Sequence, residues 1–295
     1  MAFRSMKEIM DRAEKLNGDI VSAIVESECK DYGMDKEDVY LRMEEMWSSM
    51  YQAGIEYDET LHSKSGLVGT DGQKMINYIQ KEESYSGDFM GNVIAEAIKM
   101  GESNACMKRI VAAPTAGSCG VLPAVLITSF KKFSLSTQEI LDSLFVAAGI
   151  GQVISERASL AGATGGCQAE IGSAAAMAAG ALVHLKGGSL SQISNAVAIA
   201  LKNMLGLVCD PVAGLVEVPC VKRNVAGAVN AIAAADMALA GISSNIPADE
   251  VIDAMREIGD DMPTKYKETA CGGCAVTETG KRIAKKMKDM QKSMI

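Results

Sequence analysis

Three cysteines have surroundings that suit metal ligation: Cys167, Cys209 and Cys220. Cys167 follows two glycines, Cys209 comes two residues before a proline, and Cys220 comes directly after another proline. Such breaks between helices can bring distant thiolates together, and the neighbouring amides can donate hydrogen bonds to sulfur. A cysteine that only fills a core is expected in the middle of a helix. The positions of these three cysteines therefore indicate metal ligands.

The spacing of the cysteines leaves a second interpretation open. Intervals of 41 and 10 residues separate them and match no short ferredoxin-like or zinc-finger pattern, so buried thiols acting as small hydrophobic side chains are an alternative. Three thiolates would leave one iron of a cube-shaped 4Fe-4S cluster open, and an open iron can act as a Lewis acid on a substrate oxygen. Four cysteine ligands would suit electron transfer instead.

The composition favours a globular protein with a small-molecule substrate. The 295 residues are 48% hydrophobic, which is enough for a sizeable core. The net charge of -8 argues against nucleic acid or an anionic membrane surface as the partner, because either would be repelled. No secretory signal is visible, and residues 225–242 are too polar for a membrane span. We expect a cytoplasmic protein, whose eight cysteines would not form a disulfide framework.

Helical patterns dominate the sequence and predict an all-α fold. Apolar residues recur on one face of a helix that opens near Asp35, which predicts a stripe of core residues. Two other segments have the capping-box spacing that starts a helix. Only residues 214–219 are a candidate strand. The stripe consists of Val39, Met43, Met46, Trp47 and Met50, and the capping boxes pair Ser136 with Glu139 and Ser189 with Gln192.

The distribution of residue types predicts how the helices are organised. Ala and Gly are abundant and only 4% of residues are aromatic, so we expect a multi-helix catalytic domain whose helices pack closely through small side chains. The first 60 residues are instead charged and methionine-rich. We therefore expect residues 1–60 to form a helical cover, part of the same unit as a cluster-binding catalytic domain at residues 61–295.

Three long segments resemble the alpha chain of bacterial, two-subunit, iron-sulfur-dependent L-serine dehydratases. They are APTAGSCGVLPAVL at residues 113–126, GATGGCQAEIGSAAAMAAGALV at residues 162–183, and GLVCDPVAGLVEVPCVKRNVAGAVNAIAAADMALAG at residues 206–241. The resemblance extends from about residue 60 to residue 284. A chance match over motifs of this length is improbable.

The resemblance implies a cofactor, a reaction and a partner. In that family the cysteines of the GCQ, CDP and VPC motifs hold a 4Fe-4S cluster, and these are Cys167, Cys209 and Cys220 here. The implied lyase converts L-serine to pyruvate and ammonia by β-elimination, with the open iron acting on the substrate hydroxyl and without pyridoxal phosphate. The family also has a smaller, separate beta subunit with a Ser-Ser-Ser-His-Thr motif that this chain lacks. We expect the complete active site at the interface with that subunit.

The segment before residue 121 is predicted to bind the substrate carboxylate. Backbone amides at the start of the helix near Val121, with the Thr115 and Ser118 hydroxyls and the Gly117 turn, can bind an anion. An ordinary capped helix is the alternative, because Ser and Thr cap many helices for structural reasons. Since the segment resembles the family's most recognisable signature, we favour substrate binding.

Two further groups of site residues follow from the resemblance. Residues 65–71 resemble the family's S/T-G-L-T-G-G-D loop, with departures at positions 68 and 70, and this predicts that Ser65 and Asp71 bind substrate. At least one of residues 222–224 is expected to face the cluster or the substrate. We predict that Asn224 binds substrate and that Lys222 is the catalytic base, unless the partner subunit supplies the base.

A second cysteine pair departs from the family pattern. In the Cys271-Gly272-Gly273-Cys274 turn, the family leads us to expect Leu at position 274 and a polar residue at position 271. The pair could be spare thiols, a redox pair or an additional cluster ligand. We favour spare or auxiliary thiols, because no βαβ pattern surrounds the turn. The alternative functions are a non-catalytic iron-sulfur or zinc protein using these thiols, and a related lyase acting on threonine or cysteine.

Overall fold

The computed structural model describes residues 3–81 and 84–292, and it confirms the predicted all-α fold. No strand occurs within these ranges, where Cys209 and Lys267 form only an isolated bridge. The helices are α1 (Met6–Lys15), α2 (Ile20–Tyr32), α3 (Lys36–Ile55), α4 (Asp71–Ile79), α5 (Gly87–Ala105), α6 (Val121–Phe133), α7 (Thr137–Arg157), α8 (Gly162–Gly165), α9 (Ser173–Leu185), α10 (Leu190–Lys202), α11 (Cys220–Leu239), α12 (Ala248–Asp261) and α13 (Glu278–Lys292). The short turns are η1 (Ala116–Ser118), η2 (Gln168–Gly172), η3 (Val212–Gly214), η4 (Thr264–Tyr266) and η5 (Gly273–Val276).

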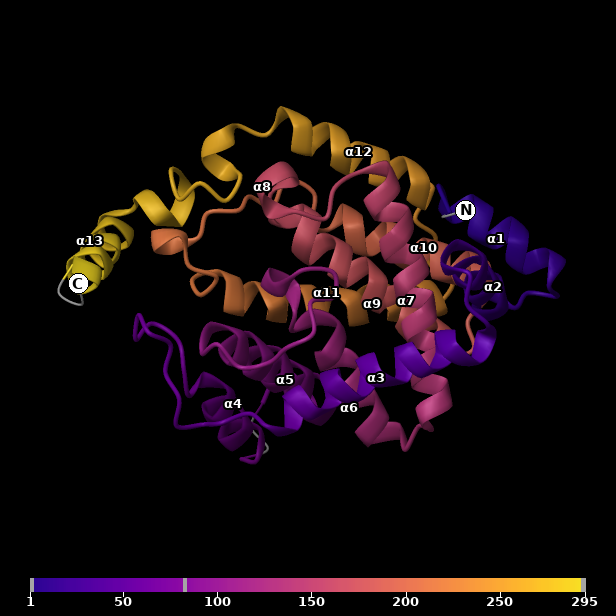
Figure 1. The fold of residues 1–295 in the computed structure, drawn as a ribbon, viewed down its shortest axis with the longest axis horizontal. Helices are drawn as coiled ribbons and strands as arrows, with labels where there is room; N and C mark the ends of the chain where they lie inside the picture. The colour runs from indigo at the N-terminus through magenta and orange to yellow at the C-terminus, as the bar shows by residue number, and fades with distance from the viewer. Residues whose placement is uncertain (1–2, 82–83, 293–295) are drawn as a thin grey trace.

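Helix α9 forms the centre of the molecule, with α6, α7, α10 and α11 packed around it (Figure 1). All five alanines between positions 174 and 179 are fully buried, and Met177 among them is buried as well. A Cβ atom on Gly180 would lie 2.2 Å from Cδ1 of Ile150 in α7, so this helix crossing requires glycine. The prediction of close packing through small side chains is therefore confirmed.

The helix starts follow their predicted caps. The Asp35 side chain accepts a hydrogen bond from the Asp38 amide at the start of α3. Both predicted capping boxes form, at the starts of α7 and α10. The predicted core stripe of α3 is right for Val39, Trp47 and Met50 but wrong for Met46, which is 47% exposed because it points away from the helices beneath α3.

The candidate strand at residues 214–219 is wrong. The segment is an irregular loop between η3 and α11. Strand hydrogen bonds need a neighbouring strand, and the described part of the chain offers none. This loop instead connects Cys209 to Cys220.

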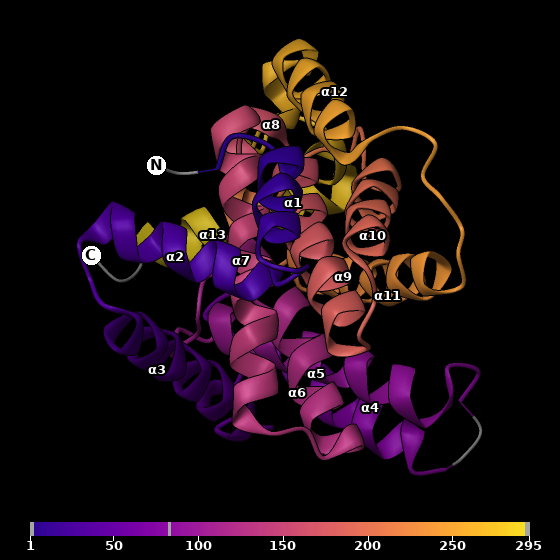
Figure 2. The ribbon, with the colours of Figure 1, turned by 90° about the vertical axis from the view of Figure 1, so that its right-hand side faces the viewer.

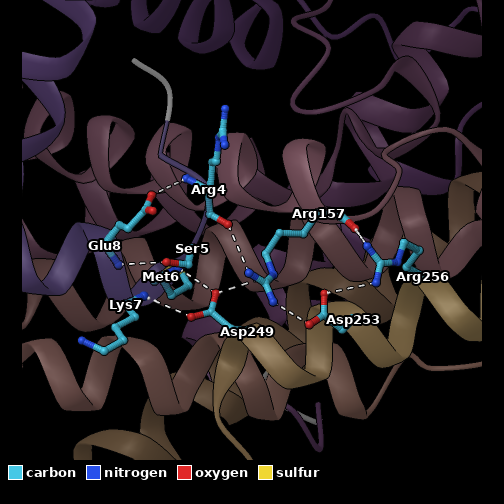
Figure 3. A network of polar contacts seen from close by, with 9 residues as sticks. All are labelled: Arg4, Ser5, Met6, Lys7, Glu8, Arg157, Asp249, Asp253 and Arg256. Carbon is cyan, nitrogen blue, oxygen red and sulfur yellow. Dashed lines mark hydrogen bonds and ion pairs between the residues drawn. The ribbon is translucent and has the colours of Figure 1, made fainter.

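The N-terminal helices cover α7 on one side of the molecule (Figure 2). A polar network joins the segment before α1 to the C-terminal end of α7 and the N-terminal half of α12 (Figure 3). We call it the N-terminal junction; it consists of Arg4, Met6, Arg157, Asp249 and Asp253. Arg157 forms an ion pair with Asp253 at 2.5 Å and donates to the Arg4 carbonyl at 3.3 Å. Asp249 accepts a hydrogen bond from the Met6 amide at 2.8 Å, where the positive end of the α1 dipole favours a carboxylate.

Two further sequence predictions concern membrane-spanning helices and the domain boundary. No helix in the described ranges is long and apolar enough to cross a membrane. The division between a cover at residues 1–60 and a catalytic domain at residues 61–295 stays a prediction.

Candidate metal centre and substrate site

The three predicted ligands come from the segments around α9 and α11. Cys167 directly precedes η2, a π-helical turn that leads into α9, and such turns are frequent at functional sites. Gly166 positions Cys167: its φ is +76°, and a Cβ atom there would lie 2.7 Å from Sδ of Met262. Only glycine fits this conformation and this space. Cys209 lies in the loop after α10, and Cys220 is the first residue of α11.

All three thiols are buried and form no disulfide, with 2%, 3% and 8% exposure for Cys167, Cys209 and Cys220. The sulfur atoms of Cys167 and Cys209 and a carboxylate oxygen of Glu170 all lie within 4.8 Å of one another. In residues 3–81 and 84–292, no other group of three such ligand atoms converges this closely. Cys220 lies outside that group, but near enough that a Cys167 thiolate contributes to raising its pKa.

Arg223 places a guanidinium group beside the cysteines of this pocket. Its Nη1 donates to the Cys167 sulfur at 3.4 Å and to the Val208 carbonyl at 2.8 Å, and its Nη2 pairs with Asp210 at 2.7 Å. The hydrogen bond from Cys209, assisted by the Arg223 charge, lowers the pKa of Cys167. The same hydrogen bond and burial raise the pKa of Cys209, and burial raises the pKa of Cys220 to about 12.

The donor set fits an iron-sulfur cluster. Thiolates are soft ligands that select iron-sulfur clusters, zinc or copper(I). A cysteine binds metal as thiolate, and the position of Arg223 stabilises that form at Cys167. A pair of buried thiols beside an arginine is more than core packing requires. The arrangement therefore favours ligation over buried, inert thiols.

The predicted substrate-binding turn lies against this pocket. The Thr115 hydroxyl donates to Oε1 of Glu170 at 2.8 Å. A Cβ atom on Gly117 would lie 3.0 Å from the same oxygen. Thr115 also forms a capping box with the fully buried Ser118, so part of the alternative interpretation, an ordinary cap, is present. Helix α6 starts at Val121 as expected.

Asn224 joins the turn to the cysteines. This buried side chain accepts from the Gly120 amide at 2.8 Å and donates to the carbonyls of Gly117 and Cys220 at 2.9 and 3.0 Å. The bonds to Gly117 and Gly120 hold the Thr115 turn against the start of α11. The structure therefore brings Thr115, Gly117, Ser118 and Asn224 together with the cysteines.

The other predicted residues form a second group around the 65–71 loop. Lys222 Nζ and Oδ2 of Asp71 lie 2.5 Å apart, and the lysines Lys222 and Lys74 lower the pKa of Asp71. The Ser65 hydroxyl donates to the buried Glu217. Within the described chain, Ser65, Asp71 and Lys222 form no hydrogen bond or ion pair with the cysteines or the Thr115 turn.

Three carboxylates of the site were missed by the sequence analysis. Glu217 holds Ser65, and the buried Glu102 accepts from the amides of Asp71 and Gly72 at 2.9 and 3.1 Å. Burial raises the pKa of Glu170. A lone acid within the small, apolar segment QAEIGSAAAMAAGA was the available signal for Glu170.

The segment with the second cysteine pair packs beside the metal pocket. The Cys274 amide donates to Oδ2 of Asp210 at 2.6 Å. Asp210 directly follows Cys209 in the sequence. Both Cys271 and Cys274 are exposed, and neither belongs to the converging ligand group. A hydrogen bond with Asp210 raises the pKa of Cys274, which disfavours its thiolate.

Comparison with known proteins gives a consistent result. The sequence model of the family described as serine dehydratase alpha chain matches residues 15–275. "Probable L-serine dehydratase, alpha chain" of Bacillus subtilis is 47% identical over 285 residues, which cover 97% of this chain and 95% of the relative. "L-serine dehydratase, alpha chain" of Peptoniphilus asaccharolyticus is 39% identical over 278 residues, covering 94% and 95%. "L-serine dehydratase" of Haemophilus influenzae is 40% identical over 253 residues, covering 82% of this chain but 54% of the relative.

Proposed function

Because this chain belongs to the family of serine dehydratase alpha chains, we propose that it is the cluster-carrying subunit of an enzyme that converts L-serine to pyruvate and ammonia. The observation that carries the proposal is the buried convergence of Cys167 and Cys209, with Arg223 beside them and the Thr115 turn against them. This arrangement combines a thiolate site with an anion-binding turn in one place.

We propose that Cys167, Cys209 and Cys220 hold a 4Fe-4S cluster. When bound, such a cluster supplies a Lewis-acid iron for the β-hydroxyl of the substrate, and no pyridoxal phosphate is needed as electron sink. Arg223 supports the cluster site by donating to Cys167 and by balancing the negative charge of the thiolates.

The substrate carboxylate is proposed to bind at the Thr115 turn. The N–H groups of Ala116 and Gly117 donate no hydrogen bond within the described chain, so they are free to donate to an anion. Asn224 orients this turn, since two of its hydrogen bonds join the turn to the start of α11. The turn would therefore present a fixed carboxylate site beside the cysteines.

The α-proton is proposed to go to Lys222 or to a group of the partner subunit. Lys222 pairs with Asp71 in this structure. To act as the base, Lys222 must leave this ion pair and face the substrate. Loss of the proton and the hydroxyl gives aminoacrylate, which tautomerises and hydrolyses to pyruvate and ammonia.

A separate beta subunit is proposed as the partner. The relatives named as alpha chains are covered to 95% of their length, whereas the Haemophilus influenzae relative is covered to 54%. The remaining part of that longer relative has no counterpart in this alignment. This difference in length supports a second chain that completes the enzyme.

The proposal is tested by anaerobic reconstitution with iron and sulfide, followed by addition of the beta subunit and measurement of pyruvate. Serine-dependent pyruvate formation is expected from the wild type and its loss from Cys209→Ala. Turnover of serine, threonine and cysteine should be compared, and a preference for threonine or cysteine would change the assigned substrate. If Cys209→Ala keeps both activity and metal, the proposed ligands are wrong.

A non-catalytic iron-sulfur or zinc protein that uses Cys271 and Cys274 is the competing proposal. No observation favours it, since both thiols are exposed and lie outside the converging group. A single bound zinc, or a cluster whose spectrum does not respond to serine, would support it.

A further inference from the structure

Glu170 lies where a ligand in addition to the cysteines would lie. One of its carboxylate oxygens is within 4.8 Å of the sulfur atoms of both Cys167 and Cys209. Glu170 follows Cys167 by three residues, and both lie at the π-helical turn η2. In the described part of the chain, it is the one carboxylate that converges with cysteine sulfurs in this way.

The two oxygens of Glu170 have different surroundings. Oε1 accepts the Thr115 hydroxyl at 2.8 Å, whereas Oε2 accepts no hydrogen bond from any described residue. A Cβ atom on Gly162 would lie 2.7 Å from Oε2 and 3.1 Å from the Cys209 sulfur. Oε2 and this sulfur therefore share one small space, which glycine at position 162 leaves open.

Glu170 also has no cationic partner among the described residues, although its side chain is only partly exposed. A carboxylate that is partly removed from water and has no cation beside it is destabilised, and Thr115 satisfies only one of its oxygens. Arg223, the cation beside the cysteines, contacts Cys167 and Asp210 instead. A metal ion is the missing partner that this geometry would accommodate.

We infer that Glu170 is the fourth protein ligand of the cluster when substrate is absent, and that it binds the open iron through Oε2. This inference rests on the proposed function, because it needs the cluster held by the three cysteines. Carboxylate oxygen is a harder ligand than thiolate, so a substrate oxygen can replace it more readily than it could replace a fourth cysteine. The released Glu170 stays bonded to Thr115, in the turn proposed to bind the substrate.

The test compares Glu170→Gln with wild type in the complex of both subunits. The variant keeps the size of the side chain but replaces the carboxylate with a weakly ligating amide. Glu268→Gln is the matched control, because Glu268 donates its backbone amide to the Cys209 carbonyl while its side chain is exposed. Thermal unfolding of each protein shows whether the variants remain folded.

The measured quantity is the rate at which the cluster loses its fourth iron. Ferricyanide accepts one electron from the cluster in its 2+ state, and the resulting 3+ state releases Fe²⁺ to leave a 3Fe-4S cluster in the 1+ state. That product gives an electron paramagnetic resonance signal. Glu170→Gln should form it several-fold faster than wild type or Glu268→Gln, and added serine should reduce the difference.

A further variant, Glu170→Ala, keeps the inference testable if the glutamine variant is unstable. It removes both carboxylate oxygens and leaves Thr115 in place, so it should also lose the fourth iron several-fold faster than wild type. The inference is overturned if either folded variant, Glu170→Gln or Glu170→Ala, loses iron at the wild-type rate. Failure of the wild type itself to bind a cluster would overturn the proposed function instead.

Discussion

The cysteine site and the N-terminal junction both join segments that are far apart in the sequence, but they do so in different surroundings. In the cysteine site (Cys167, Glu170, Cys209, Cys220 and Arg223), the Arg223 and Asp210 side chains that form its ion pair are 16% and 4% exposed. In the N-terminal junction, the corresponding values for Arg157 and Asp253 are 26% and 37%. Water can replace a lost partner at the junction more easily than at the site.

This difference sets how much one side chain matters in each region. A buried polar group that loses its partner keeps its full desolvation cost. A half-exposed ion pair contributes about 0–1 kcal/mol and is screened by salt. Substitutions at the cysteine site should therefore affect stability and activity together, whereas substitutions at the junction should affect stability alone.

The largest effect is expected for Asn224→Ala. The substitution leaves the Gly120 amide and the Gly117 carbonyl without their partner, which should cost about 3 kcal/mol in the free energy of unfolding. Pyruvate formation should be lost, because the turn is no longer held against α11. Urea unfolding and the serine assay measure the two effects.

Asn230→Ala is the matched control on the same helix. Asn230 donates to the Ala200 carbonyl at 2.9 Å and accepts from Asn203 at 2.7 Å, away from the cysteines. Its removal should lower stability but leave the activity of the folded enzyme unchanged. Equal activity of the two folded variants would mean that Asn224 has no special part in the site.

A smaller loss of stability is expected for Gly117→Ala. The added Cβ would lie 3.0 Å from Oε1 of Glu170, so the turn or the carboxylate must shift, at about 1 kcal/mol. Because a small displacement at a binding site is costly to catalysis, kcat/KM for serine should fall about tenfold or more.

Gly151→Ala provides the comparison for the glycine variant. A Cβ atom there would meet Met177 at the same 3.0 Å, but in the core between α7 and α9. It should cost similar stability and leave kcat/KM unchanged. Wild-type kinetics in Gly117→Ala would remove this turn from the substrate site.

Arg157→Ala should have a still smaller effect, confined to stability. It removes the ion pair with Asp253 and the hydrogen bond to the Arg4 carbonyl, which should cost about 1 kcal/mol. The loss should shrink as salt is added, because the pair is partly exposed. Urea unfolding at low and high salt measures this. A large loss of serine turnover in the folded variant would show that the junction and the site are coupled.

The smallest effect is expected for His184 near the end of α9. Burial lowers its pKa from 6.5, so below about pH 6.5 the unfolded chain binds a proton that the folded chain excludes. Folding stability should therefore fall as the pH drops through this range. His184→Gln should lose less stability than wild type between about pH 7.5 and about pH 5.5. Parallel pH profiles for the variant and the wild type would contradict this.

Much of the fold could be predicted because helical signals are local. The caps at Asp35, Ser136 and Ser189 depend on residues three positions apart. The small residues of α9 predict that its neighbouring helices pack closely. The exposure of Met46 could not be predicted, because helix periodicity fixes a face but not how far the neighbouring helices cover it.

The site could be predicted only in part, because its contacts are long-range. The backbone breaks indicated the cysteines, and the position after Cys220 indicated that at least one of residues 222–224 faces inward. That Arg223 and Asn224 do so depends on the phase of α11. The bonds from Thr115 to Glu170 and from Ser65 to Glu217 join residues 55 and 152 positions apart, and no local pattern encodes them.

The most direct test is metal and sulfide analysis of the anaerobically reconstituted chain. About four iron and four sulfide per chain are expected, with loss of the cluster absorption in Cys167→Ala, Cys209→Ala and Cys220→Ala. Cys119→Ala is the control, because Cys119 is equally buried but lies outside the converging ligand group, and the variant should bind the cluster as wild type does. One zinc per chain, or an intact cluster in all three ligand variants, would contradict the account.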